Sequence, residues 1–169
     1  MIHLHNGDVV ALHAKRSGIP GEHVPFREAL VAGPVRPGDN WIEARARFLA
    51  SSYGDDLLRI SNRLFEQEQV IVNAQNADEV VLWFEHDLFC LVHFVYLLQR
   101  LPVGRTSIVW HEETLGEVEP DELLRLFNRR RPATREMVGM AREAWQGYTA
   151  EEPTALNQIV ASAAAEFPF

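Results

Sequence analysis

Hydrophobic residues follow different patterns along the chain, and the sharpest change lies near its middle. Residues 80–84 form a continuous apolar run rich in β-branched and aromatic side chains, which is typical of a strand buried on both faces. Glu85, His86 and Asp87 follow abruptly, and a long apolar segment begins at Leu88. Strand, charged turn and helix make half of a βαβ unit, in which ligands bind beyond the carboxyl end of the strand.

Three further strands are expected around this unit. Residues 1–6 form a first strand, in which Ile2 and Leu4 alternate with two histidines, residues 23–26 form a short second strand, and residues 106–110 form a fourth. Segments in which apolar residues recur at helical spacing lie between these strands. A helical pair over residues 41–76 is inserted between the second and third strands, and it either covers the site as a lid or packs as an ordinary crossover. The pattern predicts an α/β protein with a Rossmann-like, mainly parallel sheet of about four strands and helices on both faces.

Beyond residue 115 the pattern predicts helices alone. Pro120 suits the first turn of one helix, Thr134 caps another, and residues 149–152 resemble a capping box before the last. We therefore expect a Rossmann-like domain over residues 1–115 and a helical C-terminal portion over residues 116–169, packed on that domain.

The four predicted strands end in HNGD, PFRE, FEHD and WHEE. Parallel strands end at one edge of a sheet, so these polar residues should line one binding site, with the first and third strands as neighbours in a flavodoxin-like order. Histidine titrates near neutral pH and acidic neighbours orient it, so the candidate catalytic residues are His86, Glu85, Asp87, Asp8 and His111. The candidate ligand-binding residues are Asn6, Gly7, Arg27, Glu28, Glu112 and Arg130.

Several of these residues have a structural alternative. Asp8 is placed to cap the first helix, whereas Gly7 would let the backbone approach an anion there. Arg27 either binds a ligand or pairs with Glu28 or Asp8. The arginines at 129–131 suit a phosphate, or form a solvated turn. The acidic residues could instead hold a divalent cation, with His86 or His111 as nitrogen ligands, although no spacing matches a zinc signature.

Composition narrows the classes of protein. The 169 residues are 47% hydrophobic and 24% charged, as in soluble globular proteins, and the net charge of −8 argues against general nucleic-acid binding. One cysteine excludes an intrachain disulfide, the N-terminal residues do not resemble a signal peptide, and the apolar run at 88–98 is too short to span a bilayer. We expect a cytoplasmic protein. The helix over 88–101 has no polar face, which favours a homodimer.

The chain resembles a bacterial family catalogued as domain of unknown function number eighteen thirty-five. The resemblance lies in HLHNGD, FREALVAGPV, VVLWFEHDLF and LLRLFNRRRPAT, and covers most of the chain. Family members usually carry acidic or amide residues where this chain has Cys90 and Leu91, and usually a tryptophan in place of Phe26. Many continue into a further helical region beyond the position of Phe169. The resemblance implies a fold but no activity.

A small anionic ligand, phosphorylated or nucleotide-like, is therefore the leading expectation, bound by a protein that acts as a hydrolase or transferase through its His–acid pairs. The alternative is a regulatory or interaction module that contacts nucleic acid through residues 129–131. The sequence names no cofactor.

Overall fold

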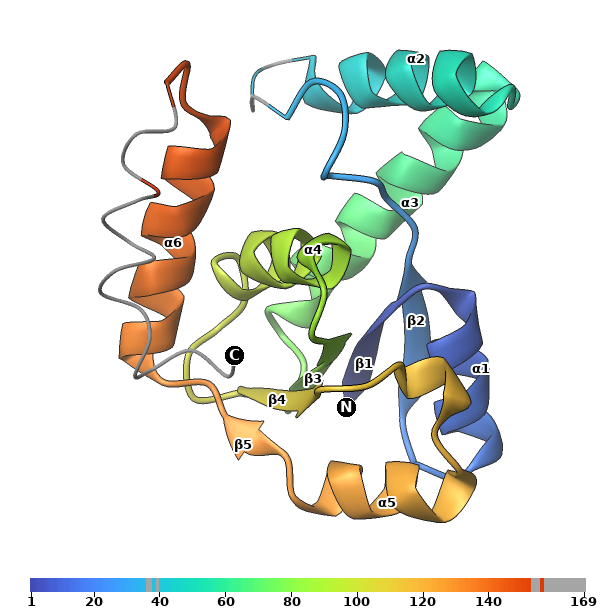
Figure 1. The fold of residues 1–169 in the computed structure, drawn as a ribbon, viewed down its shortest axis with the longest axis vertical. Helices are drawn as coiled ribbons and strands as arrows, with labels where there is room; N and C mark the ends of the chain where they lie inside the picture. Colours follow the sequence, from blue (N-terminus) through green and yellow to red (C-terminus); the bar gives the residue numbers. More distant parts are fainter. Residues whose placement is uncertain (36–37, 39, 153–155, 157–169) are drawn as a thin grey trace.

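The computed structural model of this chain describes residues 1–35, 38, 40–152 and 156. In chain order the elements are β1 (Ile2–Asn6), α1 (Asp8–Arg16), β2 (Glu22–Phe26), α2 (Trp41–Tyr53), α3 (Leu57–Ala74), β3 (Val80–Glu85), α4 (Leu88–Leu98), β4 (Thr106–His111), the 3₁₀ helix η1 (Leu115–Glu117), α5 (Pro120–Asn128), β5 (Arg131–Pro132) and α6 (Arg135–Thr149). The predicted α/β class is confirmed, and Figure 1 shows helices around one central sheet.

Within the described residues the sheet has five strands in the order β2-β1-β3-β4-β5. The first four are parallel, and β5 pairs antiparallel with β4. In β1, Leu4 lies between Val24 of β2 and Leu82 of β3, so the predicted neighbours β1 and β3 are confirmed. Because the chain leaves β1 toward β2 and returns on the other side as β3, the strand order reverses between β1 and β3.

The two faces of the sheet have separate cores, as strand alternation requires. Val81, Trp83 and Val109 pack with α1, η1 and α5 on one face. Leu82 and Phe84 belong to the opposite core, with α3, α4 and α6. Figure 1 shows α1 and α5 on one side of the sheet and α4 and α6 on the other. Strand β3 is therefore buried on both faces, which explains its continuous apolar run.

Most of helix α4 is covered within a single chain. Its residues from Val92 to Leu98 are buried, and Tyr96 contacts Trp145 of α6 with ring centroids 4.9 Å apart. Most of the apolar surface from which we predicted a homodimer is thus covered by α3, α6 and the sheet, whereas Leu88 and Phe89 at the start of the helix are exposed. The homodimer stays a prediction. None of the helices in the described part of the chain is long and apolar enough to cross a membrane.

The segment after residue 115 contributes to both cores and to the sheet. Helix α5 packs through Leu123 and Phe127 on the α1 face, α6 packs on α4, and the two residues of β5 extend the sheet where only a turn was expected. Thr134 caps α6, since its hydroxyl accepts a hydrogen bond from the Met137 amide at 3.1 Å. Nearly all of the predicted last helix lies outside the described residues.

Candidate functional site

The carboxyl ends of β1 and β3 carry the residues closest to the reversal in strand order. Helix α1 leaves β1 on one face of the sheet, and α4 leaves β3 on the other. This divergence is where open α/β sheets bind their ligands. We name the following set the switch-point site: Asn6, Gly7, Asp8, Arg27, Glu85, His86 and Asp87.

Asn6 is held by two buried side chains of α4. Its Nδ2 donates to Cys90 Sγ at 2.7 Å, and its Oδ1 accepts from His93 Nδ1 at 3.0 Å. The other ring nitrogen of His93 accepts from the Leu30 amide at 3.2 Å, which places the proton on Nδ1. Burial lowers the pKa of His93 to about 3, so the imidazole is neutral. The end of β1 is therefore clamped to α4.

Gly7, and not Asp8, occupies the N-cap position of α1. The φ of Gly7 is 88°, a conformation that favours glycine, and apart from Gly7 and its two chain neighbours no described residue has an atom within 4 Å of the position that a Cβ would take. Asp8 is the first residue of the helix and makes no capping bond, so the prediction that it caps α1 is wrong. Gly7 has no side chain, so no N-cap side chain satisfies the first backbone amides of α1.

Asp8 pairs with Arg27 from the end of β2. Arg27 Nη2 lies 2.6 Å from Asp8 Oδ1, and Arg27 Nε donates to both carboxylate oxygens at 3.0 and 2.9 Å. These hydrogen bonds hold the pKa of Asp8 below its usual range. The side chains are 43% and 64% exposed, so the pair is open to exchange with a bound anion.

Glu28 follows Arg27 but faces the interior. Its carboxylate accepts from Arg45 Nε at 2.8 Å and from Arg45 Nη2 at 2.5 Å, with side-chain exposures of 4% for Glu28 and 0% for Arg45. Glu28 therefore does not lie with the switch-point residues, because its charge is matched inside the protein.

Glu85, His86 and Asp87 form the turn between β3 and α4. Glu85 Oε2 accepts from the Leu115 amide at 2.5 Å, and burial raises the pKa of Glu85. Asp87 caps α4 through the Cys90 amide at 2.7 Å. His86 is exposed, and its own amide donates to the His111 carbonyl at 2.9 Å, which ties the turn to β4.

Glu85 and Asp87 are also the residues of this site best suited to a metal ion. One oxygen of each lies within 4.8 Å of the other and of Cys90 Sγ. Carboxylate oxygens suit Mg²⁺ or Mn²⁺, whereas a thiol binds metals as the thiolate. Burial raises the pKa of Cys90 far above its usual range, so the carboxylates are the better ligands of this group.

The remaining candidates lie further from the switch point. His111 ends β4, and its Nδ1 is turned toward the backbone of Glu113, at 3.0 Å from the carbonyl and 3.1 Å from the amide. Glu112 is exposed in the same turn. Arg130 pairs with Glu79, immediately before β3, at 2.7 Å and 3.0 Å. Since Glu79 precedes the strand, Arg130 lies at the amino edge of the sheet, away from the switch-point residues at the carboxyl edge.

Cys90 and His93 were missed by the sequence reasoning. Both belong to an apolar run, and a histidine there is more often a core residue than a functional one. Their three-residue spacing was the available signal, because it places both on the helix face that looks toward Asn6.

Comparisons were made with protein-family models, curated proteins and solved structures, and none of them matches this chain. The resemblance to the family of unknown function stays a prediction. The structural class of the protein is shown by the fold itself: it is an α/β protein with a mainly parallel sheet.

Proposed function

We propose that this protein binds a small phosphorylated ligand, nucleotide-like in character, at the switch-point site. The observation that carries the proposal is the meeting of two anion-binding groups. Gly7 opens α1 with no side-chain cap, and the Arg27 guanidinium lies against the first residue of the same helix. Helix N-termini carry a partial positive charge, and guanidinium binds phosphate oxygens in pairs.

Asp8 acts as the internal partner of Arg27 when the site holds no ligand. A phosphate that enters competes with Asp8 for a guanidinium that is already oriented toward the helix end. Preorganisation of this kind lowers the cost of binding because one rotamer-rich side chain is ordered beforehand. The negative charge of Asp8 also lies next to the site and selects against weakly bound anions.

The chemistry proposed for the site is hydrolysis or group transfer, with His86 as the proton-transferring group. His86 is exposed on the turn between two acidic residues, and histidine is the side chain most often used as a general base. Glu85 and Asp87 add negative charge that repels a phosphate. A divalent cation held between these carboxylates would reverse that repulsion, so binding is to be measured with and without Mg²⁺.

Calorimetric titration with AMP, ribose 5-phosphate and inorganic phosphate tests this proposal. Replacing Arg27 by alanine removes a charge-assisted pair of about 1.5–3 kcal/mol, and we expect binding about 10- to 100-fold weaker. Arg47→Ala is the matched control, because Arg47 is exposed and pairs with Glu43 on α2. Equal affinity in the two variants, or no binding of any of the three compounds at millimolar concentration, would refute the proposal.

The alternative function is a regulatory module that contacts nucleic acid through residues 129–131. It is less favoured, because the middle residue of this run is already paired within the protein. Arg130 forms a bidentate pair with Glu79, and its guanidinium also lies 4.2 Å from the centroid of the Phe127 ring. Arg129 and Arg131 alone are exposed in that run. Ion pairing inside the protein therefore explains the position of Arg130 without a nucleic-acid partner.

A further inference from the structure

Three histidines lie together on the opposite face of the sheet from the Asn6 clamp. His3 and His5 alternate with Leu4 on β1, and His23 is the register partner of His3 on the edge strand β2. His3 and His5 are completely buried, and His23 is partly exposed. One ring nitrogen from each residue lies within 4.8 Å of the other two. The cluster takes no part in the switch-point site.

Backbone carbonyls determine which ring nitrogens carry protons. His3 Nε2 lies 2.9 Å from the Pro20 carbonyl, and His23 Nε2 lies 2.9 Å from the Ile19 carbonyl. A carbonyl only accepts, so both Nε2 atoms carry hydrogen. His3 Nδ1 is then a lone pair, which accepts from Trp83 Nε1 at 3.0 Å.

The contact between His5 and His23 joins two ring nitrogens with one proton between them. His5 Nε2 lies 2.9 Å from His23 Nδ1. His5 Nδ1 is buried and has no hydrogen-bond partner among the described residues. Leaving a buried polar atom unpaired costs about 1–3 kcal/mol, so packing alone gives no reason for a histidine at this position.

We propose that His3, His5 and His23 bind a transition-metal ion of the zinc type. Three imidazoles are an established zinc ligand set, in which the fourth position is taken by water or substrate. Metal-bound histidines almost always donate their second ring N–H to a carbonyl or carboxylate, which orients the ligating nitrogen. His3 and His23 already have this arrangement through the carbonyls of Pro20 and Ile19.

The ion takes the place of the shared proton between His5 and His23. Zinc–nitrogen bonds of about 2.0–2.1 Å put two nitrogens of a tetrahedral site about 3.3 Å apart. The present separation of 2.9 Å must therefore widen slightly. The proton of His5 Nε2 moves to His5 Nδ1, the unpaired ring nitrogen, so three neutral imidazoles bind the ion without net release of protons.

Ring rotation accompanies binding. The rings of His3 and His23 are stacked with centroids 4.4 Å apart and an interplanar angle of 6°. A metal lies near the plane of each imidazole that binds it, so the two rings have to tilt toward each other. The tilt breaks the hydrogen bond from Trp83 to His3 Nδ1, and tryptophan fluorescence should respond. The partly exposed His23 on the edge strand provides the route of entry.

The test is a titration of the chelator-treated full chain with Zn²⁺ and with Co²⁺. We expect one equivalent of Zn²⁺ to bind, and bound Co²⁺ to show the intense visible absorption bands of an ion with a low coordination number. His23→Gln should weaken Zn²⁺ binding at least about 100-fold, beyond the loss typical of changes to groups that only support the ligands. His13→Ala is the control, because His13 lies on α1 outside the cluster.

The folding of His23→Gln is to be checked by circular dichroism. Should that variant not fold, ¹⁵N resonances of the histidine rings in the wild-type chain supply the answer, because Zn²⁺ must shift the Nδ1 signals of His3 and His23. Unchanged Zn²⁺ affinity in folded His23→Gln, or unshifted signals for these nitrogens, would overturn the proposal. Absence of binding at micromolar to millimolar Zn²⁺ would overturn it as well.

Discussion

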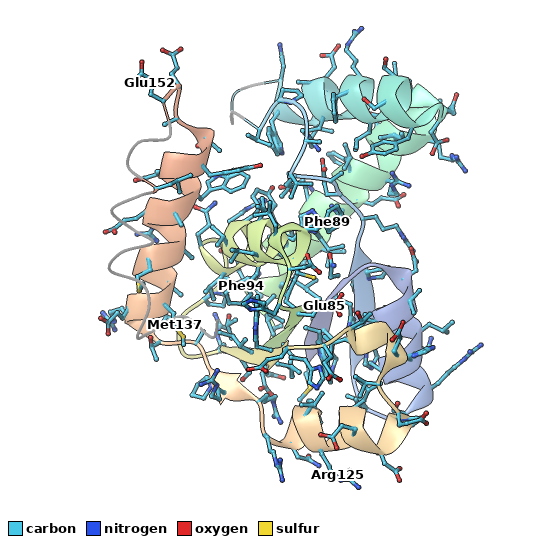
Figure 2. All side chains as sticks on the ribbon, in the orientation of Figure 1. Glu85, Phe89, Phe94, Arg125, Met137 and Glu152 are labelled. Atoms are coloured by element: carbon cyan, nitrogen blue, oxygen red, sulfur yellow. The ribbon has the colours of Figure 1, made fainter. Side chains whose placement is uncertain are left out.

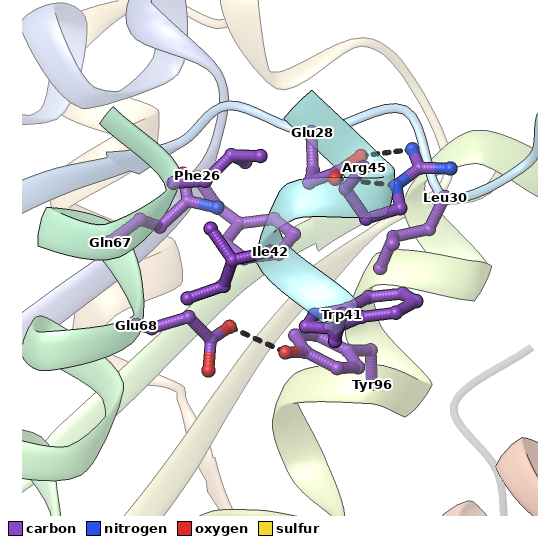
Figure 3. A pocket seen from close by; sticks show the side chains of 10 residues that line it. Phe26, Glu28, Leu30, Trp41, Ile42, Arg45, Gln67, Glu68 and Tyr96 are labelled. Atoms are coloured by element: carbon purple, nitrogen blue, oxygen red, sulfur yellow. Dashed lines mark hydrogen bonds and ion pairs between the residues drawn. The ribbon is translucent and has the colours of Figure 1, made fainter. Parts of the chain in front are cut away.

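Arg27 and Glu28 are consecutive residues at the end of β2, yet they belong to two regions with opposite properties. Arg27 turns outward to Asp8 at the switch-point site, where both side chains are substantially exposed. Glu28 turns inward to Arg45 of α2, where both side chains are buried. Figure 3 shows Glu28 and Arg45 joined beside Trp41 and Leu30, and Figure 2 shows Glu85 of the switch-point site among side chains from the other elements.

In the inner region, around Glu28 and Arg45, every N–H group of the arginine side chain has a hydrogen-bond partner within the protein. The five N–H groups of Arg45 match five bonds: two to Glu28 and three to the carbonyls of Ala29, Ala32 and Pro34. The cavity beside this pair has a volume of about 10 Å³, enough for a single water at most. A charged residue at a strand end thus becomes a structural residue when its partners are all supplied from within.

The largest expected effect lies in the inner region. Replacing Arg45 by methionine leaves the Glu28 carboxylate buried without its partner, so we expect a loss of about 3–5 kcal/mol in the free energy of unfolding. Urea denaturation measures it, with Arg47→Met on the exposed face of α2 as the control at about 0.5 kcal/mol or less. A loss below 1 kcal/mol for Arg45→Met would mean that the two regions do not differ.

The next largest effect on stability is expected when the pH is lowered, because buried histidines are neutral in the folded chain. Burial lowers the pKa of His3 to about 4 and that of His93 to about 3, against an ordinary value of 6.5. The unfolded chain then binds protons that the folded chain does not, so stability is full above pH 6.5 and falls as the pH drops toward 4. Each histidine contributes a slope of about 1.4 kcal/mol per pH unit.

Urea titrations at pH 7, 6 and 5 measure this slope. The partly exposed His13 lies outside these buried positions, so His13→Ala should keep the slope of the wild type. A free energy of unfolding that is flat over this range would contradict the burial of neutral histidines in the fold.

A smaller effect on stability is expected for the outer pair. Arg27→Ala removes an exposed ion pair, and such pairs contribute about 0–1 kcal/mol. Urea denaturation should therefore show a shift of that size, together with the loss of ligand affinity proposed above. A destabilisation comparable to that of Arg45→Met would identify Arg27 as a structural residue.

The smallest effect on stability is expected at His86. This side chain is exposed on the turn before α4, so His86→Ala should change the free energy of unfolding by about 0.5 kcal/mol or less. The same change should abolish activity or weaken ligand binding if His86 transfers a proton. Thermal melting and ligand titration of the same preparation check both expectations, and a large drop in melting temperature would assign His86 to the fold.

Much of the fold and part of the site followed from local pattern. The order of strands and helices up to β4 was predicted because periodicity and breakers act on neighbouring residues. The neighbours β1 and β3 followed from the rules of parallel sheets. The α1 cap shows what local pattern cannot predict. Asp8 is a good capping residue by type, but it pairs instead with Arg27, nineteen positions away in the chain.

The sequence by itself determined which residues end the strands and therefore which edge of the sheet is polar, because strand and helix periods are properties of a few consecutive residues. Only the tertiary structure decided that Glu28 faces Arg45, that Arg130 lies at the far edge with Glu79, and that His3, His5 and His23 meet. Pairing of charges and imidazoles across distant segments depends on how the elements pack, and packing sums over contacts that no local pattern contains.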